Sequence, residues 1–330
     1  MPKALIARER LHELLDAPRR ERARIAIVGD AMLDIYLRGD VDRISPEAPV
    51  PVVRVRERRR ALGGAANVAQ NVAALGATGE LVAAVGTDGP GAELRAMLTS
   101  LGASARGLVD TARPTTTKTR VVARGQQVVR VDEETDEDLA GAEIEAVLAA
   151  VDRAVADAGA LILEDYNKGV LVERVIARAI SAARAKGIPV IVDPKYRNFF
   201  AYRGATVFKP NRRELEAALG AAVDLEHPEA LPAVLERLGA ERLLLTLSER
   251  GMVLIDTGAT IRRIPSTARE VYDVVGAGDT VTAYLAAMMA VGADAFEAAV
   301  IANFAAGVEV GKLGAATVSP EEILAAYDAG

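Results

Sequence analysis

Cysteine and tryptophan are absent from this sequence of 330 residues, and histidine occurs only as His12 and His227. Without cysteine the chain can form no disulfide, no zinc–thiolate site and no thiol nucleophile. Two histidines in separate polar surroundings argue against a histidine-based catalytic triad or metal cluster. The lack of cysteine is also consistent with a reducing cytosol, so we expect a cytoplasmic protein.

Long hydrophobic runs are absent as well. No run approaches the roughly 18 apolar residues that a membrane span requires, and residues 1–24 contain no apolar block of signal-peptide length. A net charge of −6 argues against nucleic acid or an anionic membrane as a partner. The arginine-rich stretches 19–24 and 54–60 contain acidic residues or lie near them, and we expect them to be solvated faces.

Hydrophobic residues make up 51% of the chain and charged residues 26%, which allows a large core in one large domain or two smaller ones. An amphipathic leading helix is expected in residues 1–22. Beyond it, short continuous apolar runs alternate with helical stretches, which predicts a mainly parallel sheet covered on both faces, a three-layer α/β/α fold. The expected strands are residues 24–28, 81–85, 160–163, 189–192 and 243–247, and the expected helices are residues 64–75, 91–101, 141–155 and 172–185.

Two segments, about residues 35–62 and 113–132, interrupt this alternation. The first combines several prolines with alternating residues, and the second is rich in β-branched residues and is split by Gly125 and Gln126, as a hairpin would be. We expect both to form a small β-sheet inserted into the α/β body, where it would act as a lid. A pair of surface hairpins or a dimer contact is the alternative, and a lid can also be a dimer contact.

Two common glycine motifs can be excluded by their spelling. Residues 307–313 resemble a phosphate-binding P-loop, but the spacing is one residue short and the hydroxyl residue is missing. The first expected strand ends in GDAMLD, which has one glycine where a dinucleotide fingerprint needs three. A nicotinamide-dependent dehydrogenase is therefore disfavoured.

The stretch DVVGAGD, residues 273–279, stands directly before a helical run. Around Gly276, Ala277 and Gly278 the backbone can approach a ligand closely, and the following helix would point unpaired N–H groups at it. This pattern predicts an anion hole for a transferring phosphoryl group, with Asp279 as a nearby base. Asp279 as a simple helix N-cap is an equally good interpretation of this turn alone.

Other polar residues follow expected strands or begin expected helices. Asp34 lies beyond the first strand, and Gly63, Gly64 and Asn67 begin the next helix, where they suit sugar hydroxyls. Asn211 to Glu214 also has the spacing of a helix capping box. Residues 245–251 have the pattern of a β-hairpin as well as of a hydroxyl-rich ligand turn.

Four motifs in order resemble the ribokinase-type carbohydrate kinases: GGAAN at 63–67, NRRE at 211–214, TLSERG at 246–251 and DVVGAGD at 273–279. The resemblance covers about residues 24–320. It implies a ribokinase-like fold in a single kinase domain over residues 1–330, with the two inserted segments as a lid. It also implies ATP and Mg²⁺ as cofactors and a homodimer formed through the lid sheets.

Within this family the chain looks most like the members that phosphorylate D-glycero-D-manno-heptose 7-phosphate at C1, a step toward ADP-heptose for the lipopolysaccharide inner core. The residues that carry this are 28–53, GGAANVAQNVAALGA at 63–77, EDYNKGVL at 164–171 and DPK at 193–195. Many such kinases are fused to a nucleotidyltransferase. The chain ends at 330 without an H-x-G-H-like motif, so we expect the stand-alone form.

The resemblance assigns roles on the ATP side. Asp279 matches the catalytic base, and Gly276 to Gly278 match the anion hole. The motif Asn211, Arg212, Arg213 and Glu214 matches the residues that organise magnesium and the nucleotide phosphates, with Glu214 acting through water. Thr246, Ser248 and Gly251 match nucleotide contacts, and Asn303 matches the adenine pocket. A monovalent cation such as K⁺ would be held by Asp273, the carbonyl of Val275 and the loop 310–317.

On the acceptor side, the resemblance assigns sugar binding to Asp34, Gly63, Gly64 and Asn67. The second phosphate of the acceptor needs cationic partners, because a buried phosphate dianion must be paired. Each candidate could instead be an ordinary surface side chain. The cationic candidates are Lys118, Arg120, Lys168 and Lys195, and Asp165 and Asp193 are candidates for binding sugar hydroxyls.

Two further functions remain open at this point. One is a kinase for another sugar, sugar phosphate or nucleoside, with the same base and a different pocket. The other is a nonenzymatic sugar- or nucleotide-binding regulator. The carboxylate of Asp279 beside an anion hole argues against a regulator, because binding alone does not require a base.

Overall fold

The computed structural model describes residues 5–225, 231–258 and 260–329. Its centre is a nine-stranded sheet that is parallel from β11 to β5 in spatial order, with β12 antiparallel to both its neighbours. The strands, in spatial order, are β13 (Ile261–Ile264), β12 (Met252–Asp256), β11 (Arg242–Thr246), β10 (Val207–Phe208), β9 (Val190–Asp193), β8 (Ala160–Glu164), β1 (Arg24–Gly29), β4 (Thr78–Gly86) and β5 (Ser104–Thr111).

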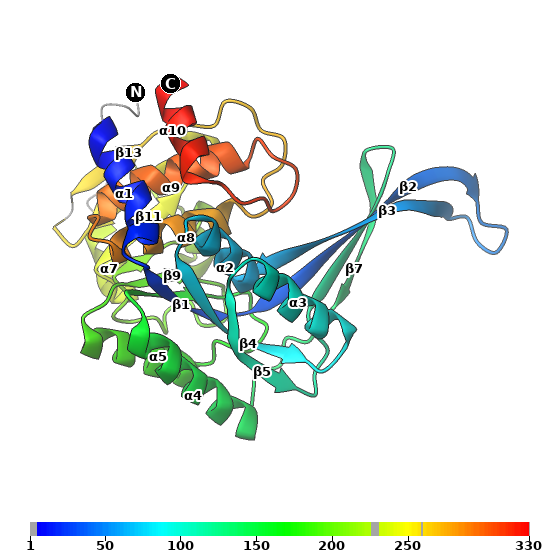
Figure 1. Ribbon diagram of the computed structural model, residues 1–330, viewed down its shortest axis with the longest axis horizontal. Helices are drawn as coiled ribbons and strands as arrows, with labels where there is room; N and C mark the ends of the chain where they lie inside the picture. Colours follow the sequence, from blue (N-terminus) through cyan, green and yellow to red (C-terminus); the bar gives the residue numbers. More distant parts are fainter. Residues whose placement is uncertain (1–4, 226–230, 259, 330) are drawn as a thin grey trace.

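Helices cover both faces of this sheet, as Figure 1 shows. Strand β1 illustrates why: Ile25 and Ile27 point into one core, while Ala26 and Val28 point into the other. The first core is covered by α1 (Arg8–Arg20), α2 (Ala65–Ala74), α3 (Gly89–Ser100), α8 (Ala277–Ala290), α9 (Ala295–Glu309) and α10 (Pro320–Ala329). The second is covered by α4 (Gly141–Asp157), α5 (Glu173–Lys186), α6 (Arg212–Leu219) and α7 (Leu231–Leu238).

The expected three-layer α/β/α fold is therefore confirmed, and the expected strands and helices agree with the observed ones to within a few residues. The leading helix expected in residues 1–22 corresponds to α1, and residues 1–4 lie outside the described part of the chain, as does His227. The predicted hairpin over residues 245–251 is also present, since β11 and β12 pair antiparallel around the short 3₁₀ helix η3 (Ser248–Arg250).

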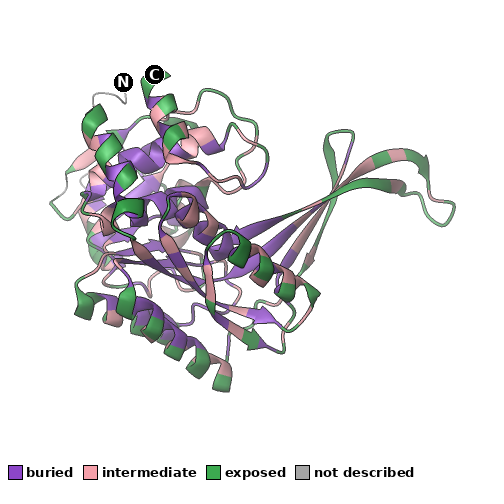
Figure 2. Ribbon diagram, viewed as in Figure 1, coloured by how far each residue is buried: buried purple, intermediate pink, exposed green. Residues whose placement is uncertain are grey.

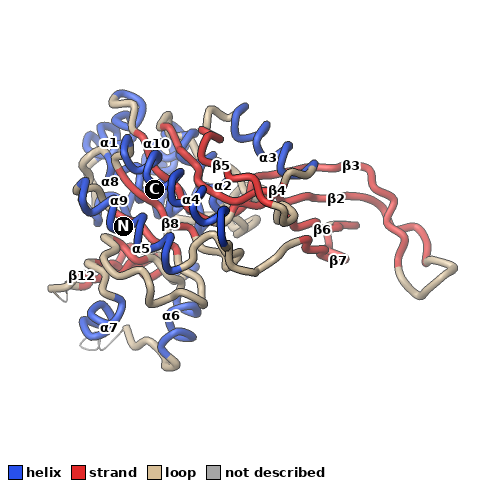
Figure 3. The backbone as a smooth tube through the Cα atoms, turned by 90° about the horizontal axis from the view of Figure 1, so that it is seen from below, coloured by secondary structure: helices blue, strands red, loops and turns tan. Residues whose placement is uncertain are grey.

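The two inserted segments form a second, four-stranded sheet, as predicted. Its strands in spatial order are β3 (Pro51–Gly64), β2 (Ala31–Ile44), β6 (Thr117–Ala123) and β7 (Gln126–Glu133). This sheet projects from the body as an arm (Figures 1 and 3). The arm is buried where β2 begins and β3 ends, and exposed toward its tip (Figure 2).

The first and last helices, α1 and α10, lie side by side on the α8–α9 face of the sheet (Figure 1). Arg8 pairs with Asp328 at 2.7 Å, and the hydroxyl of Tyr327 donates to the carbonyl of Ile6 at 3.0 Å. Within the described residues, every helix is too short or too polar to cross a membrane.

Strand β1 packs so closely against β8 that Gly29 has no room for a side chain. A Cβ at Gly29 would lie 2.0 Å from the carbonyl oxygen of Glu164. We predict that Gly29→Ala lowers the free energy of unfolding by about 1–3 kcal/mol, because the strands must separate to admit the methyl group. Urea unfolding followed by circular dichroism measures the loss.

Gly89→Ala is the matched control. A Cβ there meets nothing within 4 Å, and Gly89 is the first residue of α3. We expect this variant to be as stable as the wild type or slightly more stable, because alanine restricts the unfolded chain. Equal losses in the two variants would contradict the packing argument.

Candidate active site

The N-terminus of α8 forms the centre of the site. Gly276 is the N-cap residue, with a left-handed φ of 96°, and a Cβ there would lie 2.9 Å from Nδ2 of Asn67. Ala277, Gly278 and Asp279 follow in the first turn, where backbone N–H groups have no partner within the helix. The interpretation of Asp279 as the N-cap is therefore wrong, because Gly276 holds that position.

Asp279 is buried, with 4% of its surface exposed, and both of its carboxylate oxygens accept hydrogen bonds. Nδ2 of Asn67 donates to Oδ2 at 2.6 Å, and the hydroxyl of Tyr166 donates to Oδ1 at 2.7 Å. Burial raises the pKa of Asp279 to about 6, against the lowering effect of these two bonds. The carboxylate is thus oriented by two distant elements and still ionised at neutral pH.

Two further carboxylates lie beside Asp279. One oxygen from each of Glu164, Asp193 and Asp279 lies within 4.8 Å of the others. Glu164 is fully buried, and neither of its oxygens finds a donor among the described residues. Burial, followed by the charges of Asp193 and Asp279, raises its pKa well above the usual value. Lys209, also buried, offsets part of the charge through an ion pair of 2.7 Å with Asp193.

Glu164 and Asp193 line a cavity of about 170 Å³ at the end of the parallel strands. A divalent cation fits this donor set, because Mg²⁺ prefers oxygen ligands and keeps several waters, and Glu164 has two oxygens to offer. Gly278 at the start of α8 faces the same cavity. The remaining lining residues are Asp165, Tyr166, Pro194, Lys195, Lys209, Asn211, Glu214 and Thr246.

The predicted nucleotide motifs meet at this edge of the sheet. Asn211 and Glu214 form a capping box at the start of α6, as their spacing predicted, and also line the cavity. An isolated bridge joins Asn211 to Thr246 at the end of β11. The capping and ligand-binding interpretations are therefore compatible, since Glu214 also holds Lys195 in an ion pair.

Other predicted nucleotide residues lie farther along this surface. Arg212 pairs with Glu216 at 2.7 Å and lines a separate cavity, and Arg213 is exposed. Ser248 and Gly251 flank the turn between β11 and β12, and Asn303 on α9 donates to the carbonyl of Pro265 at 2.9 Å. None of these five residues lines the 170 Å³ cavity.

The predicted sugar residues gather on the other side of Asp279. Asp34, on β2, is 4% exposed and forms an ion pair with Arg120 on β6. A Cβ at Gly63 would lie 2.7 Å from Oδ2 of Asp34. Gly64, with φ of 57°, is the N-cap residue of α2, which carries Asn67 to Asp279.

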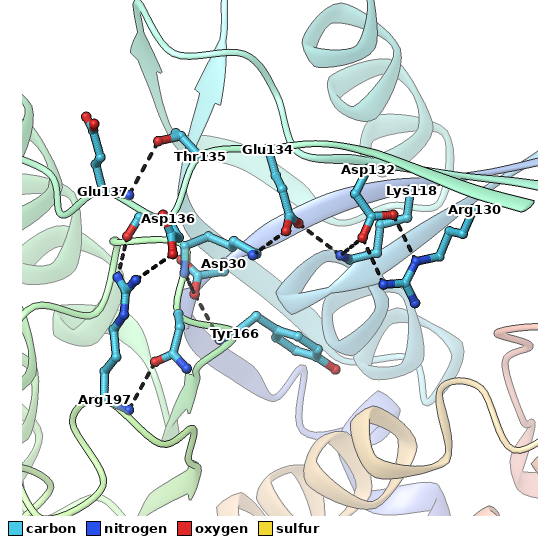
Figure 4. Close-up of polar contacts among 12 residues, drawn as sticks. Asp30, Lys118, Arg130, Asp132, Glu134, Thr135, Asp136, Glu137, Tyr166 and Arg197 are labelled. Atoms are coloured by element: carbon cyan, nitrogen blue, oxygen red, sulfur yellow. Dashed lines mark hydrogen bonds and ion pairs between the residues drawn. The ribbon is translucent and has the colours of Figure 1, made fainter.

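The four cationic candidates separate into three places. Lys118 contacts the carboxylate of Glu134 at 2.9 Å (Figure 4), and Lys168 contacts the same carboxylate at 2.7 Å. Arg120 is paired with Asp34, and Lys195 with Glu214. Two of the candidates therefore converge on one position, while the other two are engaged elsewhere.

The loop that follows β8 is held by two buried aspartates. Asp30, 1% exposed, accepts hydrogen bonds from the backbone N–H groups of Tyr166 (2.9 Å), Lys168 (2.9 Å) and Val170 (3.2 Å). Burial raises the pKa of Asp30 to about 6. Asp165 accepts from the Tyr202 hydroxyl at 2.6 Å, so it anchors the loop in addition to bordering the cavity.

Sequence reasoning did not assign roles to four of these residues: Asp30, Glu164, Tyr166 and Lys209. Three lie in stretches that were noticed, since GD ends the first strand and EDYNKG contributes to the resemblance. Lys209 follows the short strand β10. Position at the carboxyl end of a parallel strand was the available signal for all four.

The predicted cation loop is assembled around Asp273. Its Oδ1 accepts from the N–H of Val275 at 3.1 Å and its Oδ2 from the N–H of Gly314 at 3.0 Å. The N–H groups of Tyr272 and Asp273 both donate to the carbonyl of Val310. Asp273 and the loop 310–317 are thus neighbours, as the resemblance implied.

Comparison with known proteins agrees with this geometry. The model of the pfkB family carbohydrate kinases matches residues 22–322. The bifunctional protein HldE of Azorhizobium caulinodans is 48% identical over 311 residues, which cover 93% of this chain and 64% of that protein. HldE of Gluconacetobacter diazotrophicus is 46% identical over 308 residues, covering 92% and 64%. The chain thus spans somewhat less than two thirds of these relatives' length.

Solved structures show the same fold at low identity. Arabidopsis thaliana ribokinase complexed with ribose and ATP superposes with a TM-score of 0.73 at 22% identity, covering 92% of this chain and 98% of that one. Phosphofructokinase-2 from Escherichia coli in complex with potassium gives a TM-score of 0.77 at 19% identity, covering 93% and 98%. The expected ribokinase-like fold is confirmed.

Glu309, at the end of α9, provides a test of the buried charges near the cation loop. It is fully buried, and burial raises its pKa to about 8. When the pKa of an acid is higher in the folded protein than in the unfolded chain, the folded protein loses stability as the pH rises from the unfolded-state pKa to the folded-state pKa. We predict that Glu309→Gln raises stability by about 2 kcal/mol or more at pH 8, since each pKa unit corresponds to about 1.4 kcal/mol.

The gain should shrink as pH falls toward 5, and thermal unfolding across pH 5–8 in buffers free of metal cations measures it. Glu322→Gln is the control, because that exposed carboxylate pairs with Lys312. A gain from Glu309→Gln that does not vary with pH would show that the buried charge is not its source.

Proposed function

This chain belongs to the pfkB family of carbohydrate kinases, and from that premise we propose that it transfers the γ-phosphoryl group of ATP to the C1 hydroxyl of D-glycero-D-manno-heptose 7-phosphate. The observation that carries the reaction is the carboxylate of Asp279, buried in the first turn of α8, where backbone N–H groups have no partner within the helix. The heptose motifs and the paired Lys118 and Lys168 support the substrate. The product would be the 1,7-bisphosphate that leads to ADP-heptose.

Asp279 is the proposed general base. Asn67 and Tyr166 orient its oxygens, so the carboxylate meets the acceptor hydroxyl without reorganising. General base catalysis of this kind contributes about 10²–10⁴-fold to the rate. A pKa of about 6 leaves most of the base ionised at neutral pH, while keeping it a stronger proton acceptor than an exposed aspartate.

The backbone N–H groups at the start of α8 are the proposed anion hole. They are held in place by the helix, and the positive end of the helix dipole adds to their effect. One donor of this kind contributes about 3 kcal/mol to transition-state stabilisation in other enzymes. Lys209 and Lys195 border the same cavity and bring positive charge toward the transferring group.

Magnesium would be held by Glu164, Asp193 and Glu214 with the ATP phosphates, and when bound it would offset phosphate charge. Glu164 contributes the two buried oxygens that lack a donor in the described structure. Asn211, Thr246, Ser248, Gly251 and Asn303 would position the nucleotide along the edge of β11. Asp273, the Val275 carbonyl and the loop 310–317 would hold a monovalent cation beside the anion hole.

We further propose that residues 1–330 act as a single cytoplasmic kinase domain whose arm is both a lid and a dimer contact. The arm presents exposed apolar residues, including Val55 (44% exposed), Val129 (48%) and Val131 (49%). A second copy would cover them, and its formation can be measured by light scattering. A monomer at micromolar concentration would contradict the dimer.

Asp279→Asn tests the base. The substitution keeps the shape of the side chain but cannot accept the proton, so we predict ATP affinity within a few-fold of the wild type and turnover reduced by about 10²-fold or more. Calorimetry measures ATP binding, and ADP release measures turnover. Turnover near the wild-type value would remove Asp279 from the base role.

The acceptor is tested with a panel: D-glycero-D-manno-heptose 7-phosphate, the same sugar without phosphate, fructose 6-phosphate, ribose and adenosine. We expect turnover with the 7-phosphate, and phosphorus NMR should place the new phosphate on C1. A preference for ribose or adenosine would leave the proposed kinase mechanism in place but would contradict the assignment of the heptose phosphate as the substrate. Ligand binding without any turnover would instead support a regulator.

A further inference from the structure

Two lysines from different parts of the chain hold a single carboxylate. Lys118 comes from β6 of the arm, Lys168 from the loop after β8, and Glu134 follows the end of β7. Nζ of Lys118 lies 2.9 Å from Oε2 of Glu134 (Figure 4), and Nζ of Lys168 lies 2.7 Å from Oε1. Their side chains are only 16%, 17% and 24% exposed, so solvent screens the three charges little.

The charges around this carboxylate are unequal. Asp132 is shared between Lys118, at 3.2 Å, and Arg130, at 2.9 Å. Lys118, Lys168 and Arg130 bring three positive charges, against two negative charges from Asp132 and Glu134. If the Glu134 side chain left, the remaining charge would be +2, which matches a phosphate dianion. Burial tends to raise the pKa of Glu134, but hydrogen bonds from Lys168 and Lys118 outweigh it and its pKa is lowered.

This cluster adjoins the acceptor side of the site. Lys168 is two residues beyond Tyr166, so their Cα atoms are at most about 7 Å apart, and Tyr166 contacts Asp279. Lys118 is the register partner of Asp34 across β2 and β6. Asp30 fixes the loop, because it accepts hydrogen bonds from the backbone of both Tyr166 and Lys168. An acceptor with one end at Asp279 can therefore direct its other end toward the two lysines.

We propose that Lys118 and Lys168 form the subsite for a phosphate already present on the acceptor, and that Glu134 is an internal anion that occupies this subsite until the phosphate displaces it. This rests on the proposed function, because it assumes a phosphorylated acceptor. Arg120 and Lys195 are not assigned to this subsite, because they contact other carboxylates, those of Asp34 and Glu214.

Displacement of Glu134 by the acceptor phosphate would make the site specific for phosphorylated sugars. A neutral sugar leaves Glu134 on the lysines and gains nothing from them. A phosphorylated sugar replaces one carboxylate with a dianion that offers three acceptor oxygens to the same donors. Free inorganic phosphate, which lacks the sugar contacts, has to compete with a carboxylate tethered to the chain and is held weakly.

Glu134→Gln tests the internal anion, with inorganic phosphate as the probe and isothermal calorimetry as the measurement. If Glu134 occupies the lysines in about nine-tenths of the molecules, its removal tightens phosphate binding about tenfold. Glu133→Gln is the matched control: it removes the same charge one residue away, where the carboxylate accepts only from Thr117 among the described contacts. We expect this control to bind phosphate as the wild type does.

The double variant Glu134→Gln/Lys168→Met tests whether the additional phosphate binds at the two lysines. The double variant should lose the added phosphate affinity, because one of the two proposed donors is gone. Phosphate binding that is the same in wild type and Glu134→Gln would overturn the proposal. Persistence of the gain in the double variant would also overturn it, since the anion would then be bound elsewhere.

Kinetics separate this proposal from the proposed function. With the phosphorylated heptose, Glu134→Gln should lower KM several-fold with little change in kcat, and Glu133→Gln should change neither. If Glu134 instead accepts hydroxyls of the sugar, Glu134→Gln will raise KM for phosphorylated and unphosphorylated acceptors alike, and the proposal fails. If the wild type uses no phosphorylated sugar, the proposed function fails, while the phosphate calorimetry still decides whether the subsite exists.

Discussion

Burial of carboxylates at one edge of the central sheet is the constraint around which this site is organised. Strands β8 and β9 end in Glu164 and Asp193, Asp30 directly follows β1, and α8 adds Asp279. A buried charge is costly unless it is paired or hydrogen-bonded. Backbone N–H groups compensate Asp30, a buried lysine compensates Asp193, and side-chain donors compensate Asp279, whereas Glu164 has no donor among the described residues.

The loop of residues 166–170 connects the surroundings of Asp279 with the arm. It is held in place because its backbone N–H groups donate to the buried carboxylate of Asp30. Within the loop, Tyr166 contacts Asp279, and Lys168 contacts Glu134 beside the arm. Asp279 and the arm are therefore connected by a few hydrogen bonds and ion pairs.

Local sequence patterns predicted the layers of the fold and the glycine-containing turn before α8. Alternation of apolar runs with helical stretches predicted the parallel sheet, and glycines before a helical run predicted the anion hole at Gly276 to Gly278. The same local view could not tell whether Asp279 is the N-cap of α8 or lies inside the helix, nor which groups contact its carboxylate. The structure places the N-cap at Gly276, and the contacts come from Asn67 and Tyr166, which lie 212 and 113 residues away along the chain.

By itself, the sequence determined the hydrophobic periodicity of each helix and strand, the glycines at the start of α8 and the basic residues that are candidates for binding a phosphate. These depend on neighbours along the chain, whose geometry is set by backbone sterics and hydrogen bonding. Only the tertiary structure decided which lysines contact the same carboxylate. Lys118 and Lys168 are separated by 50 residues along the chain, and they meet because the arm and the loop after β8 lie together at one edge of the sheet. A buried charge there is costly unless it is paired with an opposite charge.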